Sequence, residues 1–230
     1  MRHQSRSYPS CMDDSSDTRD FTYWCSVSCR SDTARILVLV HYTQSYSRFY
    51  VYVVMIFLLP TDTCYGLAGA LIREDYEEIY RLKWRDFSKQ LAILVRDFSD
   101  MKKYIEISDE QIESLRVYPY PWSFLGKRNL IASLPDCIDP YKYEKISVRV
   151  ALSCIDANIR DTIEYPLFLT SANLSGASES KTLIEAKIVF PGIEGIDGGV
   201  CENQPSDIFS LREDGTIFYL RRNYNPLKTL

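Results

Sequence analysis

The sequence is nearly devoid of histidine: its 230 residues contain two, His3 and His41. Because no histidine follows position 41, the later part of the chain can hold neither a Ser-His-Asp or Cys-His nucleophile system nor a histidine-ligated metal site. The sequence also lacks a GxxxxGK[ST] phosphate loop, a GxGxxG turn after a strand and an HExxH motif. Any catalysis there must depend on lysine, arginine, hydroxyl, amide, tyrosine and carboxylate side chains.

The chain has no bulk basic charge and no apolar run long enough for a membrane. Because its net charge is −4, the chain has no overall positive potential that would attract nucleic acid. The apolar stretch 50–59 ends at Pro60, at about half the length of a membrane span, which predicts a buried strand. No secretory signal is visible, and one close cysteine pair (Cys25, Cys29) with two histidines does not predict zinc. We expect a cytoplasmic protein with reduced thiols and no membrane contact.

Residues 1–54 contain no lysine, no glutamate and no glycine, but ten serines. A folded segment of this length with that composition would be unusual. We therefore expect residues 55–230 to form the functional domain. Two interpretations stay open for residues 1–54: a divergent, disordered extension, or residues upstream of a natural start at Met55.

Predicted strands and helices alternate after Met55 without an internal repeat, which indicates one α/β domain with a mixed sheet. We predict strands over 56–59, 91–95, 146–150 and 166–170, helices over 74–84, 108–116 and 155–163, and a hairpin over 208–220 that turns at Asp214-Gly215. Two capping boxes support helix starts, Ser108 with Gln111 and Thr182 with Glu185.

Three polar clusters stand out. The first is Lys83-Trp84-Arg85 with Lys89, at the end of a predicted helix. Several cations in seven residues suit a polyanion such as a triphosphate. The alternative is a solvated helix end, because the negative end of the helix dipole also favours cations.

The other two clusters each follow an apolar predicted strand. They are Thr170-Ser171-Ala172-Asn173-Leu174-Ser175-Gly176 and Pro60-Thr61-Asp62-Thr63-Cys64-Tyr65-Gly66. Open α/β sheets bind ligands at strand carboxyl ends, where short hydroxyl and amide side chains can hydrogen-bond phosphate or ribose. The alternative is a pair of ordinary turns. Three such clusters favour one nucleotide pocket over coincidence.

Together these clusters resemble the motifs of the YrdC family, the threonylcarbamoyl-AMP synthases. The family patterns are PT[DE]TxYGL, KxRPxxKPL, PGPxT, VRxP and SANxSG, followed by a late Ser and an Arg. The matching segments of this chain follow the same order as the family motifs, over about residues 56–222. These segments are Pro60–Leu67, 83–85 with 89–91, 148–150, 171–176, 205–207 and 220–221. The resemblance implies an open, twisted mixed sheet with helices on both faces and a concave nucleotide pocket.

The chain departs from these patterns at three places. Asp86 and Gln90 stand where the family has proline, and PGPxT is reduced to 119–123, which keeps the hydroxyl of Ser123 but loses the glycine. The family's N-terminal helix has no clear counterpart in residues 1–54. These changes bear on rate and exact substrate more than on fold.

The resemblance implies an enzyme that joins L-threonine, bicarbonate or CO2, and ATP with Mg²⁺ into L-threonylcarbamoyladenylate and pyrophosphate. Downstream tRNA-modification proteins would use the product at tRNA adenosine 37. The implied catalytic residues are Lys83, Arg85, Ser171 and Asn173. The implied ATP-binding residues are Arg85, Lys89, Ser171, Asn173 and Arg221. The implied threonine-binding residues are Thr63, Arg149 and Ser206, and no metal ligand is assigned.

Two other functions stay open. The main alternative is a non-catalytic RNA- or nucleotide-binding protein, although residues 55–230 carry a net charge of −5, which leaves weak RNA binding at most. A carbamoyltransferase of hydrogenase maturation uses a similar domain beside zinc fingers, which these 230 residues lack.

Overall fold

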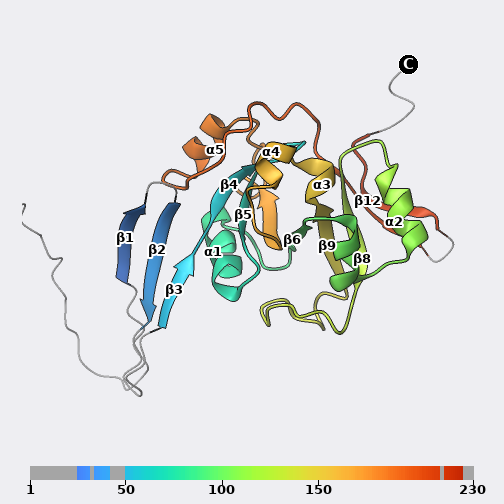
Figure 1. Ribbon diagram of the computed structural model, residues 1–230, viewed down its shortest axis with the longest axis horizontal. Coiled ribbons are helices and arrows are strands. Elements are labelled where there is room, and N and C mark those ends of the chain that lie inside the picture. The colour runs from blue at the N-terminus through green and yellow to red at the C-terminus, as the bar shows by residue number, and fades with distance from the viewer. Residues whose placement is uncertain (1–24, 32–33, 42–49, 213–214, 225–230) are drawn as a thin grey trace, which may run out of the picture.

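The computed structural model describes residues 25–31, 34–41, 50–212 and 215–224, and its strands form two separate sheets (Figure 1). The smaller sheet is antiparallel, has the order β1-β2-β3 and consists of β1 (Cys25–Ser31), β2 (Ala34–His41) and β3 (Tyr50–Val54). It stands at one end of the molecule, beside the larger sheet and the helices that cover it.

The larger sheet has nine strands, with the order β12-β11-β8-β9-β6-β10-β5-β4 and β7 paired to β8. The strands are β4 (Phe57–Pro60), β5 (Tyr65–Ala70), β6 (Ala92–Val95), β7 (Ile105–Glu106), β8 (Trp122–Arg128), β9 (Lys145–Val150), β10 (Leu167–Ser171), β11 (Asp207–Leu211) and β12 (Ile217–Arg221). β6 with β9 and β8 with β11 are parallel, and the other pairs are antiparallel. The predicted mixed α/β sheet is confirmed.

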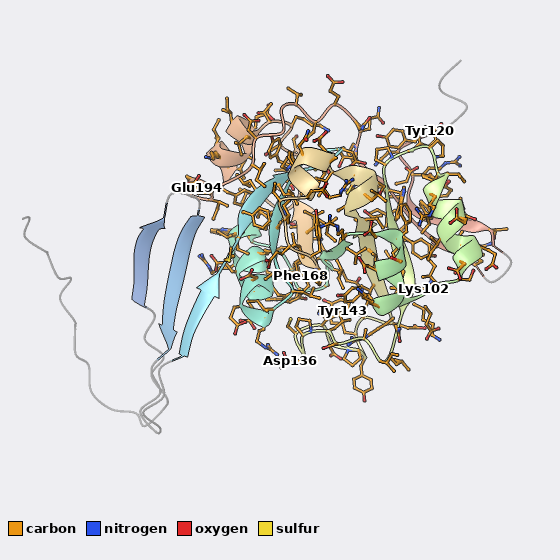
Figure 2. All side chains as sticks on the ribbon, in the orientation of Figure 1. Lys102, Tyr120, Asp136, Tyr143, Phe168 and Glu194 are labelled. Atoms are coloured by element: carbon orange, nitrogen blue, oxygen red, sulfur yellow. The ribbon has the colours of Figure 1, made fainter. Side chains whose placement is uncertain are left out.

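Helices cover both faces of this sheet. They are α1 (Arg73–Lys83), the 3₁₀ helix η1 (Phe98–Lys103), α2 (Asp109–Arg116), α3 (Ala151–Cys154), α4 (Ala157–Arg160) and α5 (Leu183–Val189). Successive residues of β10 point to opposite faces. Phe168, near the centre of the domain in Figure 2, packs in one apolar cluster with Tyr76 and Ile79 of α1. Leu169 packs in another with Cys154 of α3.

The predicted helix boundaries follow from their caps. Ser108 accepts the Gln111 N–H at 3.2 Å, and Gln111 Oε1 accepts the Ser108 N–H at 3.0 Å. Thr182 and Glu185 form the second predicted capping box at the start of α5. α1 ends at Lys83 because Trp84 adopts the left-handed conformation, with φ of 51°. Both capping boxes and the helix near 74–84 are confirmed.

Two predicted elements are wrong. The helix predicted over 155–163 is only the short α4: α3 ends before this span, Ile155 is extended, and Asp156 caps α4 by accepting the Asn158 N–H at 2.9 Å. The single strand predicted over 50–59 is β3 and β4, which belong to different sheets. The predicted hairpin is β11 and β12; its turn residue Asp214 lies outside the described residues, and Gly215 has a φ of 80°.

Nothing in the described ranges has the length and apolar character of a membrane-crossing helix. The described members of all three apolar clusters lie between Ile56 and Tyr219. At the start of this part of the chain, the Met55 N–H donates to Asp75 Oδ1 at 3.3 Å. The core of the larger sheet is therefore built after residue 55.

We predict that residues 55–230, expressed alone, unfold cooperatively in urea, because they contain these apolar clusters. Far-ultraviolet circular dichroism and tyrosine fluorescence should give one coincident transition, with a midpoint close to that of the 230-residue chain. An insoluble product or two separate transitions would show that residues 1–54 are part of the folding unit.

Candidate functional site

The site is a cleft with a volume of about 200 Å³, built where the β4–β5 loop, the end of α1 and the ends of β9, β10 and β12 meet. Its lining is mostly hydroxyl, amide and guanidinium groups. The lining residues are Thr61, Thr63, Cys64, Gly66, Arg85, Gln90, Ala92, Ser123, Ser147, Arg149, Leu169, Thr170, Ser171, Glu179, Ser206, Ile208 and Arg221.

Lys83 lies behind the cleft wall and stabilises the turn after β10. Its side chain is 1% exposed, and its ammonium donates to the carbonyl oxygen of Ser171, to that of Asn173 at 2.6 Å and to Asn173 Oδ1 at 3.1 Å. Burial, followed by the charge of Arg85, lowers the pKa of Lys83 to about 7, while the oxygen acceptors favour the charged form. The last residue of α1 thus fixes the turn that follows β10.

The turn after β10 is also held by its own side chains. Ser171 Oγ donates to Asn173 Oδ1 at 2.6 Å, and Asn173 Nδ2 donates to the Ala177 carbonyl at 2.6 Å. Ser171 lines the cleft, whereas Asn173 is 8% exposed and stands behind it. Of this pair, Ser171 can contact a ligand directly and Asn173 shapes the turn.

Arg85 lines the cleft just after α1. Its Nε donates to the Lys89 carbonyl at 3.0 Å and its Nη2 to the Gln90 carbonyl at 2.9 Å, so the backbone of this segment positions the guanidinium in the cleft wall. Lys89 is exposed outside the cleft lining, with Nζ 3.5 Å from Ser175 Oγ. Only one of these two cations therefore belongs to the cleft wall.

The β4–β5 loop supplies hydroxyl groups. Thr61 Oγ1 accepts the N–H groups of Thr63 and Cys64, each at 3.3 Å, and donates to the Cys64 carbonyl at 2.7 Å. The Lys181 ammonium donates to the Thr63 carbonyl at 2.6 Å and braces the loop from outside. Burial raises the pKa of the Cys64 thiol to about 11, so this sulfur remains a neutral thiol.

Arg149 forms a buried ion pair at the floor of the cleft. Its Nη2 lies 2.5 Å from Asp62 Oδ1, and the two side chains are 8% and 18% exposed. Arg149 Nε is buried and has no hydrogen-bond partner among the described residues. The carboxylate of the β4–β5 loop therefore fixes this guanidinium while leaving one of its donors unused.

Ser206 and Arg221 close the opposite side. Arg221 Nε donates to the Ser206 carbonyl at 2.9 Å, and its Nη2 donates to Ser206 Oγ at 3.2 Å. Ser206 Oγ also lies 3.4 Å from Ser123 Oγ, the hydroxyl retained in the altered segment 119–123. The end of β12 thus brings a cation to the start of β8 and β11.

The structure brings most of the residues singled out by the sequence to one place. Those in the cleft wall are Thr63, Arg85, Arg149, Ser171, Ser206 and Arg221. Lys83, Lys89 and Asn173 lie outside the lining. Sequence reasoning missed Cys64, Ser147 and Glu179 as cleft residues. No motif signalled Glu179, whereas Cys64 stands at the variable position of the matched segment Pro60–Leu67. In the described part of the chain, no group of three or more histidine, cysteine or acidic side chains could hold a metal ion.

We predict that Asp62→Ala lowers the free energy of unfolding by about 2–3 kcal/mol, because it leaves the buried Arg149 guanidinium without its anion. Glu106→Gln is the matched control: it breaks the exposed Lys127–Glu106 pair, with side chains 59% and 49% exposed, and should cost under about 1 kcal/mol. Urea unfolding measures both. Equal costs for the two variants would contradict a structural role for the buried pair.

The chain is similar in sequence to a known protein family and to named relatives. The family model Sua5_yciO_yrdC, described as "Telomere recombination", matches residues 55–223. A Methanocaldococcus jannaschii protein, named provisionally as a threonylcarbamoyl-AMP synthase, is 32% identical over 76% of this chain and 83% of its own length. Human threonylcarbamoyl-AMP synthase is 29% identical over 61% of this chain and 50% of its own. The chain thus spans about half the length of that human relative.

Among solved structures, P. abyssi Sua5 shares the fold, with a TM-score of 0.63 and 24% identity over 75% of this chain and 54% of that one. A second structure of that protein, in complex with L-threonine, matches with a TM-score of 0.56 and 24% identity over 68% of this chain and 47% of that one. The match of the family model over most of the chain and the ordered motifs in one cleft lead to the same result: this chain is a member of the Sua5/YciO/YrdC family.

Proposed function

We propose that the chain is a threonylcarbamoyl-AMP synthase, which forms L-threonylcarbamoyladenylate and pyrophosphate from L-threonine, bicarbonate or CO2, and ATP. The observation that carries the proposal is the cleft itself. It unites Arg85 and Ser171, which we assign to one end, with the buried Arg149, which we assign to the other, in a chain whose relatives are named for this activity. P. abyssi Sua5 in complex with L-threonine supports the amino-acid substrate.

The first end of the cleft binds the triphosphate. Arg85 offers its guanidinium to phosphate oxygens, and Ser171 offers its hydroxyl. Lys83 adds its charge from beneath the turn and keeps Ser171 in place through the carbonyl contacts. Lys89, exposed at the rim, neutralises the outer phosphates, and Arg221 holds the nucleotide from the side of β12. Charge on the departing pyrophosphate is thereby stabilised.

The second end binds L-threonine. The unused Nε–H of Arg149 is the donor for the threonine carboxylate. Thr63 and Ser206 place hydroxyl groups in the same cleft as this guanidinium. Because Asp62 already fixes the guanidinium, the carboxylate binds to a positioned donor and loses little orientational entropy.

The chemistry needs alignment rather than a covalent enzyme intermediate. The α-ammonium group of L-threonine releases one proton to solvent, and the resulting amine adds to CO2. The nitrogen releases a second proton to solvent as the carbamate anion forms. A carbamate oxygen then bonds to the α-phosphorus of ATP, the bond from that phosphorus to the bridging α–β oxygen breaks, and pyrophosphate leaves. Mg²⁺ bound to ATP would neutralise charge on the phosphate groups, and we assign no residue of the chain to it.

The alternative, a non-catalytic RNA- or nucleotide-binding protein, is not favoured, because the relatives are named as synthases. Incubation with ATP, L-threonine and bicarbonate separates the two functions. The synthase releases pyrophosphate only when all three are present. Nucleotide or RNA binding without pyrophosphate would support the alternative. Transfer of the product to tRNA by downstream proteins, weak RNA binding and a cytoplasmic location stay predictions.

We predict that Arg85→Met lowers threonine-dependent pyrophosphate release by about 100-fold, the typical effect of removing one positioned donor from a developing charge. Arg81→Met is the control, since Arg81 lies on the same helix, is exposed and pairs with Glu78. That variant should keep near wild-type turnover. Equal turnover of wild type and Arg85→Met would refute the role of Arg85.

We predict that ATP binding takes up protons between pH 7 and 8. The pKa of Lys83 is about 7 in the free chain, so a large share of this group is neutral there. A polyanion nearby raises that pKa and recharges the amine. Isothermal titration in two buffers of different ionisation enthalpy measures the uptake, which should fade as the pH drops below 7. Lys83→Met should abolish it, and Lys89→Met should keep it. Identical heats in both buffers for the wild type would contradict the predicted rise in the pKa of Lys83 on ATP binding.

A further inference from the structure

Two buried side-chain atoms of the described residues lack a hydrogen-bond partner: Arg149 Nε and Glu179 Oε2. One is a donor and the other an acceptor, and both residues line the same cleft. A buried polar atom without a hydrogen-bond partner destabilises the protein. A ligand that forms hydrogen bonds with both atoms should therefore bind more tightly than a ligand that bonds to only one of them.

Glu179 lines the cleft together with Cys64 and Arg149. Its charge acts on the Lys83 ammonium, which supports the phosphate end. It also acts on the Cys64 thiol, beside Thr63, and the Arg149 guanidinium acts on that same sulfur with the opposite sign. Glu179 and Arg149 thus face a common region near Cys64. The last torsion of a glutamate is soft, so a small rotation presents either carboxylate oxygen to the cleft.

The charge of Glu179 restricts what it can bind. Among the described lining residues it is the only carboxylate. A carboxylate repels ATP, bicarbonate and pyrophosphate, which are all anions. The one organic cation among the proposed substrates is the α-ammonium group of L-threonine. The Arg149 guanidinium and the Glu179 carboxylate also complement a zwitterionic amino acid, whose carboxylate can pair with Arg149 and whose ammonium group can pair with Glu179.

We propose that Glu179 binds the α-ammonium group of L-threonine while Arg149 binds its carboxylate, so that the pair selects a zwitterionic amino acid. This inference rests on the proposed function and adds a residue to it. It also explains a position that no motif marks: Glu179 follows the Ser171–Gly176 segment, and the turn at that segment places it in the cleft. The amine is thereby held beside the phosphate end, where the carbamate must form.

The test compares two ligands that differ by the amine. L-Threonine and (R)-3-hydroxybutanoate, which has the same carboxylate and hydroxyl, are titrated into the 230-residue wild type and Glu179→Gln. We expect the substitution to lower the affinity for L-threonine by about ten-fold or more. The affinity for (R)-3-hydroxybutanoate should stay within about two-fold of the wild-type value. Glu202→Gln, which removes the same charge from an exposed position outside the cleft lining, should change neither affinity.

Two results would overturn the inference alone: unchanged L-threonine affinity in Glu179→Gln, or equal weakening of both ligands. A changed Mg²⁺ requirement for pyrophosphate release, with unchanged threonine affinity, would make Glu179 a metal ligand and also overturn it. If the wild type neither binds L-threonine nor releases pyrophosphate, the proposed function fails first and the inference with it.

Discussion

The site depends on one buried contact, the Lys83 ammonium inserted into the turn after β10. This contact joins the end of α1 to the carboxyl end of a central strand, two elements separated by almost ninety residues of chain. A lysine that is 1% exposed is tolerated there because carbonyl and amide oxygens surround its amine. Without it, the ends of α1 and β10 would lose the link that holds Ser171 and Arg85 on one cleft wall.

A second constraint fixes the other end of the cleft. The Asp62–Arg149 pair ties the β4–β5 loop to β9, and the Lys181 ammonium ties the same loop to the Asn203 carbonyl. Both contacts use charged groups to hold loops rather than to bind ligand. The free donors that remain, Arg149 Nε among them, are consequently few and well positioned. Such positioning by the protein is what a reaction without a covalent intermediate requires.

Much of this architecture could be predicted from local sequence signals. The capping boxes at Ser108 and Thr182 follow from short-range chemistry, as do the strands predicted over 56–59, 91–95, 146–150 and 166–170, and the structure has them near the predicted residues. The strands β5, β7 and β8 were not predicted. The predicted helix over 155–163 failed because Asp156 favours a new cap over helix continuation. The strand over 50–59 failed because an apolar run does not reveal which sheet it joins.

The sequence by itself determined the family, through ordered motifs from Pro60 to Arg221, and it excluded histidine chemistry after residue 41. It also predicted Arg85, Ser171, Arg149 and Arg221 as site residues, and these four line one cleft. Only the tertiary structure decided which of these face the cleft and which stand behind it. The reason is physical: whether an amine or a carboxylate is free to bind a ligand depends on the partners it meets across the fold, and those partners lie far away in the chain.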